Sequence, residues 1–230
     1  MKVAIHQAEH LPWFGYFHKI FNADIFIILD HVQFKKNYFE NRNRIYTAQG
    51  LQYITLPVQM KGHINKKFYE IKLVENWKKK YIKTLTFTYQ KAPFYTDVKP
   101  IIALINDYKG NKLFEINMLI IQNIMLSLNI YTNLILASEL QPQGQKTELL
   151  IDILSKVDAS SYIVGKSGFD YMNLKLFHQK NIRLEEHQVN HIKYTPFNYK
   201  DFTDYPSILD LIANFGFKKV ETLIKNNKIV

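Results

Sequence analysis

The sequence contains no cysteine among its 230 residues. This absence excludes disulfides, thiolate zinc sites and a cysteine nucleophile, and it suits the reducing cytoplasm, where we expect this chain. No window holds the roughly 18 uninterrupted apolar residues that a membrane-spanning helix needs. His6 also interrupts the N-terminus too early for the apolar core of a signal peptide. We therefore expect a soluble protein without a membrane span.

Repeats, low-complexity tracts and Ser/Gly linkers are also missing. The segment most similar to a linker is the polar stretch at 141–145, which holds one proline and one glycine. The chain is 47% hydrophobic and 14% aromatic, which is ample for a packed core. We predict a single α/β domain over residues 1–230, with a helical lobe at approximately 76–130.

Acidic residues are few between positions 31 and 91, where thirteen lysines and arginines face only three glutamates. This basic segment carries the whole net charge of +10. A local positive field concentrates anionic partners, such as nucleotide sugars, carrier proteins, tRNA or lipid head groups. A solvated lysine-rich face explains the lysines beyond residue 60 equally well. Arg42 and Arg44 stand beside asparagines and suit bidentate contact with phosphate or carboxylate.

Hydrophobic patterning predicts the secondary structure. A coarse reading of the hydrophobic pattern predicts strands near 3–6, 25–30, 51–58, 69–74, 133–137, 161–165 and 182–186. Helical spacing predicts helices at 14–22, 76–90, 97–109, 112–128, 147–157 and 171–179, and Thr147 and Ser207 are candidate N-caps. Strands and helices alternate at both ends of the chain, which favours a Rossmann-like, mostly parallel sheet. The loop after 51–58 favours an antiparallel hairpin with 69–74, and the helices from 76 to 128 form the added lobe.

Polar clusters follow the first two predicted strands. His6 and Gln7 close the first strand, and Asp30 closes the second after five apolar residues. Carboxyl ends of parallel strands meet at one edge of a sheet, where open α/β proteins bind ligands. His6 can be structural or catalytic there, whereas a buried Asp30 would be costly without a partner. We predict His6 and Asp30 as the catalytic pair.

The other candidates are substrate-binding side chains near the same edge. Trp13 and Tyr16 can stack on a sugar or base, or they can pack in the core. His18 lies in the first predicted helix, where it can bind a ligand or cover the sheet. Gln33 and Asn41 offer neutral donors and acceptors for hydroxyl groups. The predicted substrate contacts are Gln7, Trp13, Tyr16, His18, Gln33, Asn41, Arg42, Lys166 and Ser167.

A second strand-to-helix turn is predicted at Gly165-Lys166-Ser167-Gly168. The turn is not a P-loop, because Ser160 stands where that motif needs its first glycine. Its backbone N–H groups and the Lys166 ammonium can hold a phosphate or a carboxylate. An ordinary tight turn is an equally good interpretation.

Metal and cofactor signals are weak. His187 and His191 have the spacing of two metal ligands on a helix, but the surrounding pattern is extended. We therefore predict no metal site and no cofactor.

A series of short motifs runs in a distinctive order from His6 to Ile45. The motifs are His6-Gln7, Leu11-Pro12-Trp13, Gly15-Tyr16-Phe17-His18-Lys19, Leu29-Asp30, Val32-Gln33-Phe34 and Asn41-Arg42-Asn43-Arg44-Ile45. In this order the chain resembles the WbqC-like proteins of bacterial surface-polysaccharide gene clusters, and the resemblance continues to the end through 146–147, 162–168 and 205–210. The chain departs from the family pattern at Ala8-Glu9-His10, where the family shows Pro-Asn-Tyr, and at His31, where it shows a second acidic residue.

The resemblance implies a role in making O-antigen-type sugars of lipopolysaccharide, with transfer of glycine or another amino acid to an amino sugar. The expected reaction moves an aminoacyl or acyl group to an amino group of a nucleotide-linked sugar. His6 or Asp30 would take the proton, and Arg42 would stabilise the oxyanion. The donor is open among a carrier-protein thioester, an aminoacyl-tRNA and an aminoacyl adenylate.

Two alternatives remain. Residues 11–18 resemble the His-x-Gly-His motif of nucleotidylyltransferases in place, though not in spacing, which suggests an adenylate-forming or nucleotidyl-transferring enzyme. The chain can also be a non-catalytic nucleotide-sugar binding protein. Substitution of His6 separates catalysis from binding.

Overall fold

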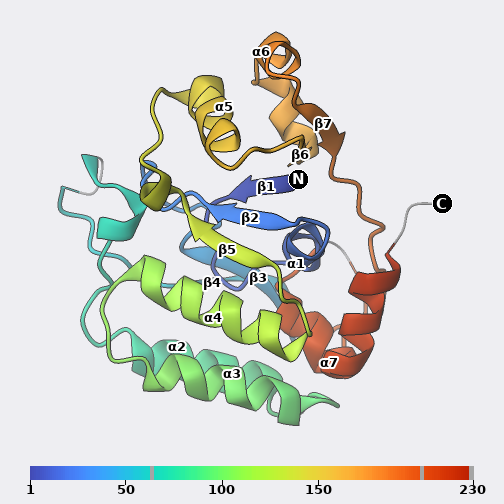
Figure 1. Ribbon diagram of the computed structural model, residues 1–230. Coiled ribbons are helices and arrows are strands. Elements are labelled where there is room, and N and C mark those ends of the chain that lie inside the picture. The colour runs from blue at the N-terminus through green and yellow to red at the C-terminus, as the bar shows by residue number, and fades with distance from the viewer. Residues whose placement is uncertain (63–64, 203–204, 228–230) are drawn as a thin grey trace.

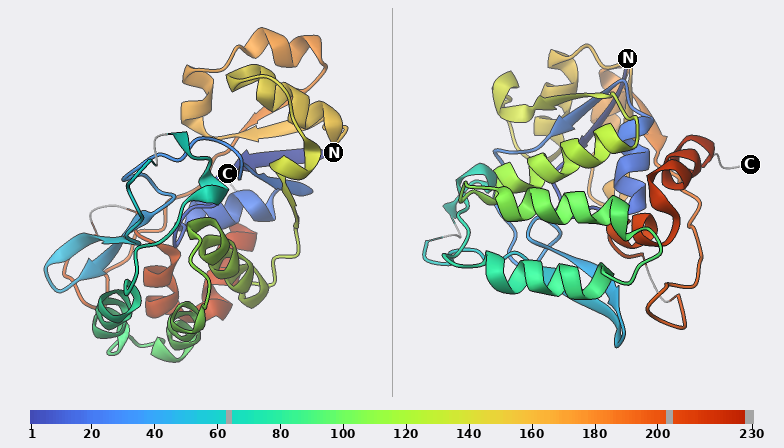
Figure 2. Two further views of the ribbon diagram at one scale, coloured as in Figure 1. Left: turned by 90° about the vertical axis from the view of Figure 1, so that its left-hand side faces the viewer. Right: turned by 90° about the horizontal axis from the view of Figure 1, so that it is seen from below.

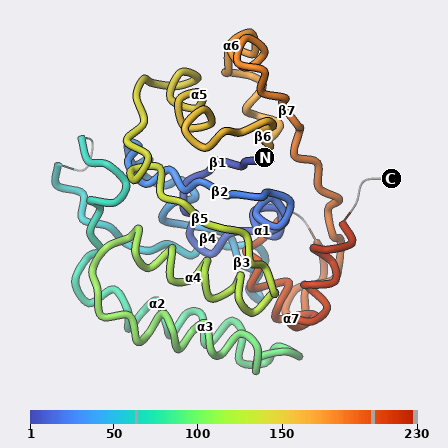
Figure 3. Tube along the Cα trace, in the orientation of Figure 1, coloured from blue at the N-terminus to red at the C-terminus, as the bar shows by residue number. Residues whose placement is uncertain are grey.

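A five-stranded parallel sheet organises the chain, in a computed structural model that describes residues 1–62, 65–202 and 205–227. The strands are β1 (Lys2–His6), β2 (Ile25–Ile28), β5 (Asn133–Leu136), β6 (Ser161–Val164) and β7 (Arg183–Glu186). They lie in the order β5-β2-β1-β6-β7 (Figure 3). Counted along the chain, the parallel strands therefore read 3-2-1-4-5, which is the Rossmann order. The predicted fold class is confirmed.

Helices cover both faces of this sheet (Figure 1). On the upper face in that view lie α5 (Lys146–Lys156) and α6 (Leu174–Gln179); below lie α1 (Phe14–Phe21), α4 (Leu113–Ser127) and α7 (Ile208–Asn226). Successive strand residues point to opposite faces. Ala4, Phe26 and Ile163 consequently join the core on the α1 side, and Val3 and Val164 join the core on the α5 side.

The predicted helical lobe is present as α2 (Lys78–Tyr89), α3 (Tyr95–Asp107) and α4. The view from below shows the three helices side by side (Figure 2). Their buried side chains, such as Leu85, Ile101 and Ile121, belong to the same apolar cluster as the α1 face of the sheet. The lobe is thus stacked against the sheet through one shared core.

The antiparallel hairpin differs from the prediction. It pairs β3 (Arg42–Thr47) with β4 (Gly50–Thr55), whereas residues 68–70 form a 3-10 turn, and only an isolated bridge between Val58 and Leu73 joins the two segments expected to pair. The sequence does not indicate β3, because residues 41–44 are all polar and lack the apolar pattern of a strand. Asn43 is nevertheless buried, because its amide donates to the carbonyls of His10 and Leu11 at 3.2 and 2.8 Å.

The two predicted N-caps have different outcomes. Ser207 begins α7, and its hydroxyl accepts a hydrogen bond from the Leu209 N–H at 3.2 Å. Thr147 is not a cap, since α5 already begins at Lys146, and the Thr147 hydroxyl instead accepts from the Asn173 N–H at 3.1 Å. Among the residues described, no helix has the length and apolarity to cross a membrane.

Candidate functional site

The strand order reverses between β1 and β6, which makes their carboxyl ends the topological switch point of the sheet. His6 ends β1 at this switch point, and Asp30, Gly165 and His187 follow the ends of β2, β6 and β7 at the same edge. Ligands of open α/β sheets bind at such a switch point. The candidate site is therefore built around His6.

The His6 imidazole is oriented by its neighbours. Its Nδ1–H donates to the Gln7 carbonyl at 3.2 Å, so Nε2 carries the lone pair. Nε2 lies 3.8 Å from Oε1 of Glu9, and the Tyr16 ring stands edge-on to the imidazole at 5.4 Å. The side chain is 33% exposed, so it forms the solvent-facing part of the site. The rest of the side chain is buried, and this burial, together with the charge of Lys19, lowers the pKa of His6 far below its usual range.

Two glutamates lie behind His6. Glu9 is 7% exposed and Glu40 is 2% exposed, and Oε2 of each has no hydrogen-bond partner among the residues described. Burial and the nearby charge of Glu40 raise the pKa of Glu9 to about 8. Burial also raises the pKa of Glu40 to about 7. Both carboxyl groups can therefore exchange a proton near neutral pH.

A buried lysine completes the cluster. Lys19 projects from α1, is 6% exposed, and has no carboxylate within ion-pair distance in the described part of the chain. Burial lowers the pKa of Lys19 to about 8, against the opposing effect of Glu9. Groups with strongly shifted pKa values that share a crevice mark candidate functional sites. We call His6, Glu9, Lys19 and Glu40 the titratable cluster.

Asn117 of α4 positions this cluster through the backbone. Its amide donates to the carbonyls of Ala8 and Glu40 at 2.8 and 2.7 Å, which draws the two glutamate-bearing segments together. His10 in turn donates from Nδ1 to Oδ1 of Asn117 at 2.9 Å and accepts from the Tyr81 hydroxyl at 2.5 Å. His10 thus serves as a buried anchor of the loop after β1.

Asp30, the predicted partner of His6, is held elsewhere. Its carboxylate accepts from the backbone N–H of Ser138 at 2.9 Å and from the Ser138 hydroxyl at 2.5 Å. His31 lies 3.6 Å away, and no contact with His6 is present among the described residues. Asp30 therefore ties the end of β2 to the end of β5, and a direct catalytic role stays a prediction.

The predicted contacts on and before the hairpin lie apart from His6. The Arg42 guanidinium lies over the Tyr53 ring at 4.1 Å. The Asn41 amide donates to the Leu56 carbonyl at 3.2 Å, and Gln33 is exposed and bridged to Lys67. Asn41 follows Glu40 directly in the chain, but its side chain is held at Leu56, and the Arg42 guanidinium is held at Tyr53.

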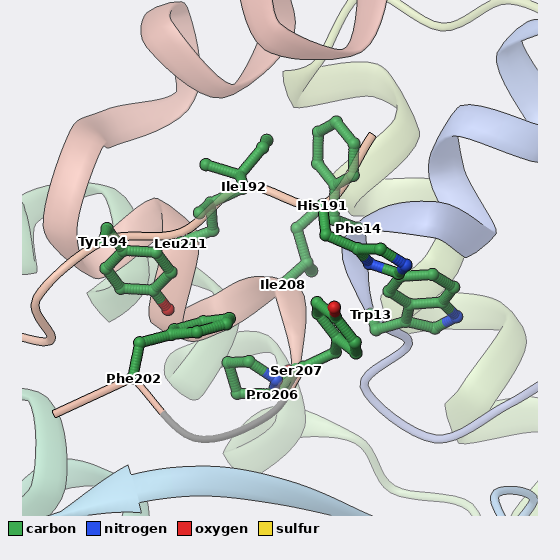
Figure 4. Close-up of a pocket in the computed structure, with 11 residues that line it drawn as sticks. Trp13, Phe14, His191, Ile192, Tyr194, Phe202, Pro206, Ser207, Ile208 and Leu211 are labelled. Atoms are coloured by element: carbon green, nitrogen blue, oxygen red, sulfur yellow. The ribbon is translucent and has the colours of Figure 1, made fainter. Parts of the chain in front are cut away.

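Trp13 is enclosed by aromatic neighbours (Figure 4). Its ring stacks against His191 at 5.8 Å and contacts Tyr205 at 5.7 Å. The cavity beside it holds only about 20 Å³, which is close to the space of one water molecule. A sugar ring does not fit there, so a stacking role for Trp13 requires this wall to open.

The turn at 165–168 and His187 lie at the same edge of the sheet as His6. Lys166 and Ser167 are exposed at the start of a 3-10 helix, with their side chains in solvent. His187 contacts His18 of α1, with 3.0 Å between Nε2 of His187 and Nδ1 of His18. His187 and His191 lie in an extended segment after β7, as the sequence indicates.

Sequence reasoning missed Glu9, Lys19 and Glu40 as site residues. Glu9 stands three positions after His6, which is a usable signal, but it falls where the chain departs from the family pattern. Lys19 and Glu40 have no such local signal, because their proximity to His6 depends on the packing of α1 and on Asn117.

Comparison with known proteins agrees with the motif order. The WbqC-like protein family matches residues 7–222. The chain belongs to the WbqC-like family. This WbqC-like protein is 34% identical over 228 residues to the uncharacterized protein Rv1507c of Mycobacterium tuberculosis, and the match covers 94% of each chain. No solved structure matches the chain.

Proposed function

We propose that this WbqC-like protein is a transferase that moves an aminoacyl or acyl group to an amino group of a sugar in surface-polysaccharide or related biosynthesis. The observation that carries the proposal is the titratable cluster at the switch point of the sheet. Amide formation needs a proton acceptor and a proton donor near neutral pH, and Glu9 with a pKa of about 8 supplies both forms. The family resemblance supports the sugar as the acceptor.

The reaction can be written with the residues present. The acceptor enters as an ammonium, and the Glu9 carboxylate takes one proton to free the nitrogen lone pair. The nitrogen attacks the carbonyl carbon of the donor, and the bond from that carbon to the leaving group breaks. The leaving group takes the proton from Glu9, and the second proton lost by the nitrogen passes to solvent. His6 accepts a hydrogen bond from the attacking amine through Nε2 and orients it.

The donor belongs to one of three classes, a carrier-protein thioester, an aminoacyl-tRNA or an aminoacyl adenylate. All three are anionic or arrive on an anionic carrier, which suits the basic segment. Lys35, at the start of this segment, lowers the pKa of Glu40 through its charge, whereas the lysines of α2 belong to the outer helical layer (Figure 1).

The test combines nucleotide-linked amino sugars with each donor class and measures the mass of the acceptor. The expected product gains the mass of one acyl or aminoacyl group. A plain acyl group removes the reactivity of the sugar toward amine reagents, whereas an aminoacyl group replaces the sugar amine with the amine of the amino acid. Glu9→Gln removes the proton carrier while keeping the side chain's size, so turnover should fall about 100-fold or more. Asp210→Asn is the matched control, because Asp210 is also buried with a raised pKa but hydrogen-bonds to Tyr46 and Tyr89, away from the cluster.

Three outcomes contradict the proposal. Sugar binding without any transfer indicates a binding protein. Release of pyrophosphate from ATP before an amine is added indicates an adenylate-forming enzyme. Equal turnover of Glu9→Gln and the native protein removes Glu9 from the reaction.

A further inference from the structure

His6, Gly165 and His187 occupy equivalent positions at the carboxyl ends of three parallel strands. Val164 pairs with Glu186, which sets Gly165 beside His187. The pairing of β1 with β6 ends at Ala4 and Ile163, so His6 and Gly165 lie two residues beyond it in the same register. The His187 N–H still donates to the Val164 carbonyl at 2.6 Å, which extends the ladder of β6 and β7 to His187.

The three residues also share the face of the sheet that packs on α1. His6 contacts Tyr16 of α1 and His187 contacts His18 of the same helix. Gly165 follows Ile163 by two positions, and Ile163 belongs to the core on that face. Both imidazoles therefore flank the position where residue 165 has no side chain.

Gly165 leaves a hollow between the two histidines. A Cβ atom built on Gly165 meets no atom within 4 Å. Its backbone is extended, with φ of −66° and ψ of 150°, so the glycine is not required by the chain's conformation. Adjacent strands lie about 4.8 Å apart, which separates the His6 and His187 backbones by roughly 10 Å. This separation can hold a group of the size of a phosphate or a carboxylate.

Lys19 supplies a positive charge near the hollow. It has no ion-pair partner in the described residues, and its charge lowers the pKa of both His6 and His187. Farther along the same side, Lys2 pairs with Glu185 at 2.8 Å, and Glu186 is a second acidic residue. A groove of about 570 Å³ runs from His187 along these residues to the end of α7 and opens to solvent.

The hydrogen-bond network leaves a free nitrogen on each flanking histidine. His18 donates from Nε2 to the Asn227 carbonyl at 3.1 Å, so its Nδ1 accepts from Nε2 of His187. Nδ1 of His187 then has a lone pair and no partner among the described residues, as does Nε2 of His6 apart from Glu9 at 3.8 Å. An anion that enters must place a proton on one imidazole or carry its own proton.

We propose that the hollow over Gly165 is an oxyanion subsite, in which Lys19 neutralises a phosphate or carboxylate group of the substrate. Of His6 and His187, one takes up a proton and donates a hydrogen bond to the anion, and the other accepts a hydrogen bond when the anion carries its own proton. The identification of this group as part of the substrate rests on the proposed function; the anion binding does not. The subsite places the anionic group beside His6 and Glu9, where the acceptor nitrogen reacts.

Isothermal titration with inorganic phosphate and, separately, with acetate tests the proposal on the full chain. Measurement in two buffers of different ionisation enthalpy gives the protons exchanged. The expected result is saturable binding of at least one anion with net proton uptake, because the anion raises the pKa of the groups that face it, namely His6, His187, His18, Lys19 and Glu9. Binding of phosphate alone identifies a phosphate subsite, and binding of acetate alone identifies a carboxylate subsite.

Gly165→Val fills the hollow with a residue that suits an extended strand end, and it should abolish the binding. Gly165→Ala is a milder version that keeps the fold if valine does not. Lys19→Met removes the charge and should weaken binding about tenfold or more. Lys175→Ala is the control, because Lys175 is exposed on α6 and should leave the affinity unchanged.

Several results would overturn the subsite. These are no binding of either anion by the native protein, proton release instead of uptake, or native affinity in Gly165→Val and Gly165→Ala. Acyl transfer that survives in Gly165→Val without anion binding would refute the identification of the bound group as part of the substrate and leave the proposed function intact. Anion binding that persists in an inactive Glu9→Gln variant supports the subsite independently of the reaction.

Discussion

Replacement of Glu9 by glutamine should make the protein more stable above neutral pH. The pKa of Glu9 is 4.5 in a solvated chain and about 8 in the native state, where burial and Glu40 oppose ionisation. The native state therefore binds this proton more tightly than the unfolded state does. The resulting stabilisation is complete below pH 4.5 and is lost as the pH rises through 8.

The size of this effect follows from the interval between the two pKa values. At about 1.4 kcal/mol for each pH unit, ionisation of Glu9 removes roughly 5 kcal/mol of folding free energy between pH 4.5 and 8. Glutamine resembles the neutral carboxylic acid and does not ionise. The variant and the native protein should therefore have similar stability at pH 4.5, whereas the variant should be more stable by several kcal/mol at pH 9.

Urea denaturation at pH 4.5, 7 and 9 measures this difference. Asp210→Asn is the matched control, since burial also raises the pKa of Asp210 to about 8. Both variants should gain stability on the alkaline side, but only Glu9→Gln should lose transfer activity. A gap between Glu9→Gln and the native protein that does not change with pH would refute the reasoning, because Glu9 would then titrate as a solvated carboxylate.

Three further predictions concern positioning and binding. Asn117→Ala leaves the carbonyls of Ala8 and Glu40 unpaired in the core. At about 1–3 kcal/mol for each carbonyl, the variant should lose at least 2 kcal/mol of unfolding free energy in urea denaturation. A loss below about 0.5 kcal/mol would contradict the network. In steady-state kinetics, His6→Ala should lower turnover more than affinity, because an imidazole can exchange a proton at neutral pH. Lys166→Ala should lower affinity more than turnover. The reverse pattern would make His6 the binding residue and Lys166 the residue needed for turnover. Affinity for an anionic ligand should fall as salt rises, since the Debye length is about 8 Å at physiological ionic strength, and a flat salt titration would exclude a role for the basic segment.

Local patterning determines much of this fold. The apolar runs that become β1, β2 and β6 are readable because a strand buried on both faces needs consecutive hydrophobic residues, whereas the edge strand β7 is largely polar and partly exposed. The helices are readable from the 3.6-residue spacing of their apolar residues, because a helix that packs on the sheet buries one face. The motif order from His6 to Ile45 also sufficed to indicate the family, since it depends only on residue identity.

Tertiary structure alone decided the composition of the site. Glu9, Lys19 and Glu40 come from a loop, a helix and the approach to the hairpin. Asn117 draws the segments of Glu9 and Glu40 together by binding the distant carbonyls of Ala8 and Glu40, and the packing of α1 adds Lys19. Their pKa shifts arise from burial, which no local pattern encodes. Asp30 looked catalytic at the end of β2, yet its carboxylate is engaged by Ser138, whose position depends on the pairing of β2 with β5. The hollow at Gly165 likewise depends on the register of three strands, which brings His6 and His187 to its sides. Long-range strand pairing and burial, rather than residue identity, therefore determine the chemistry available at this edge.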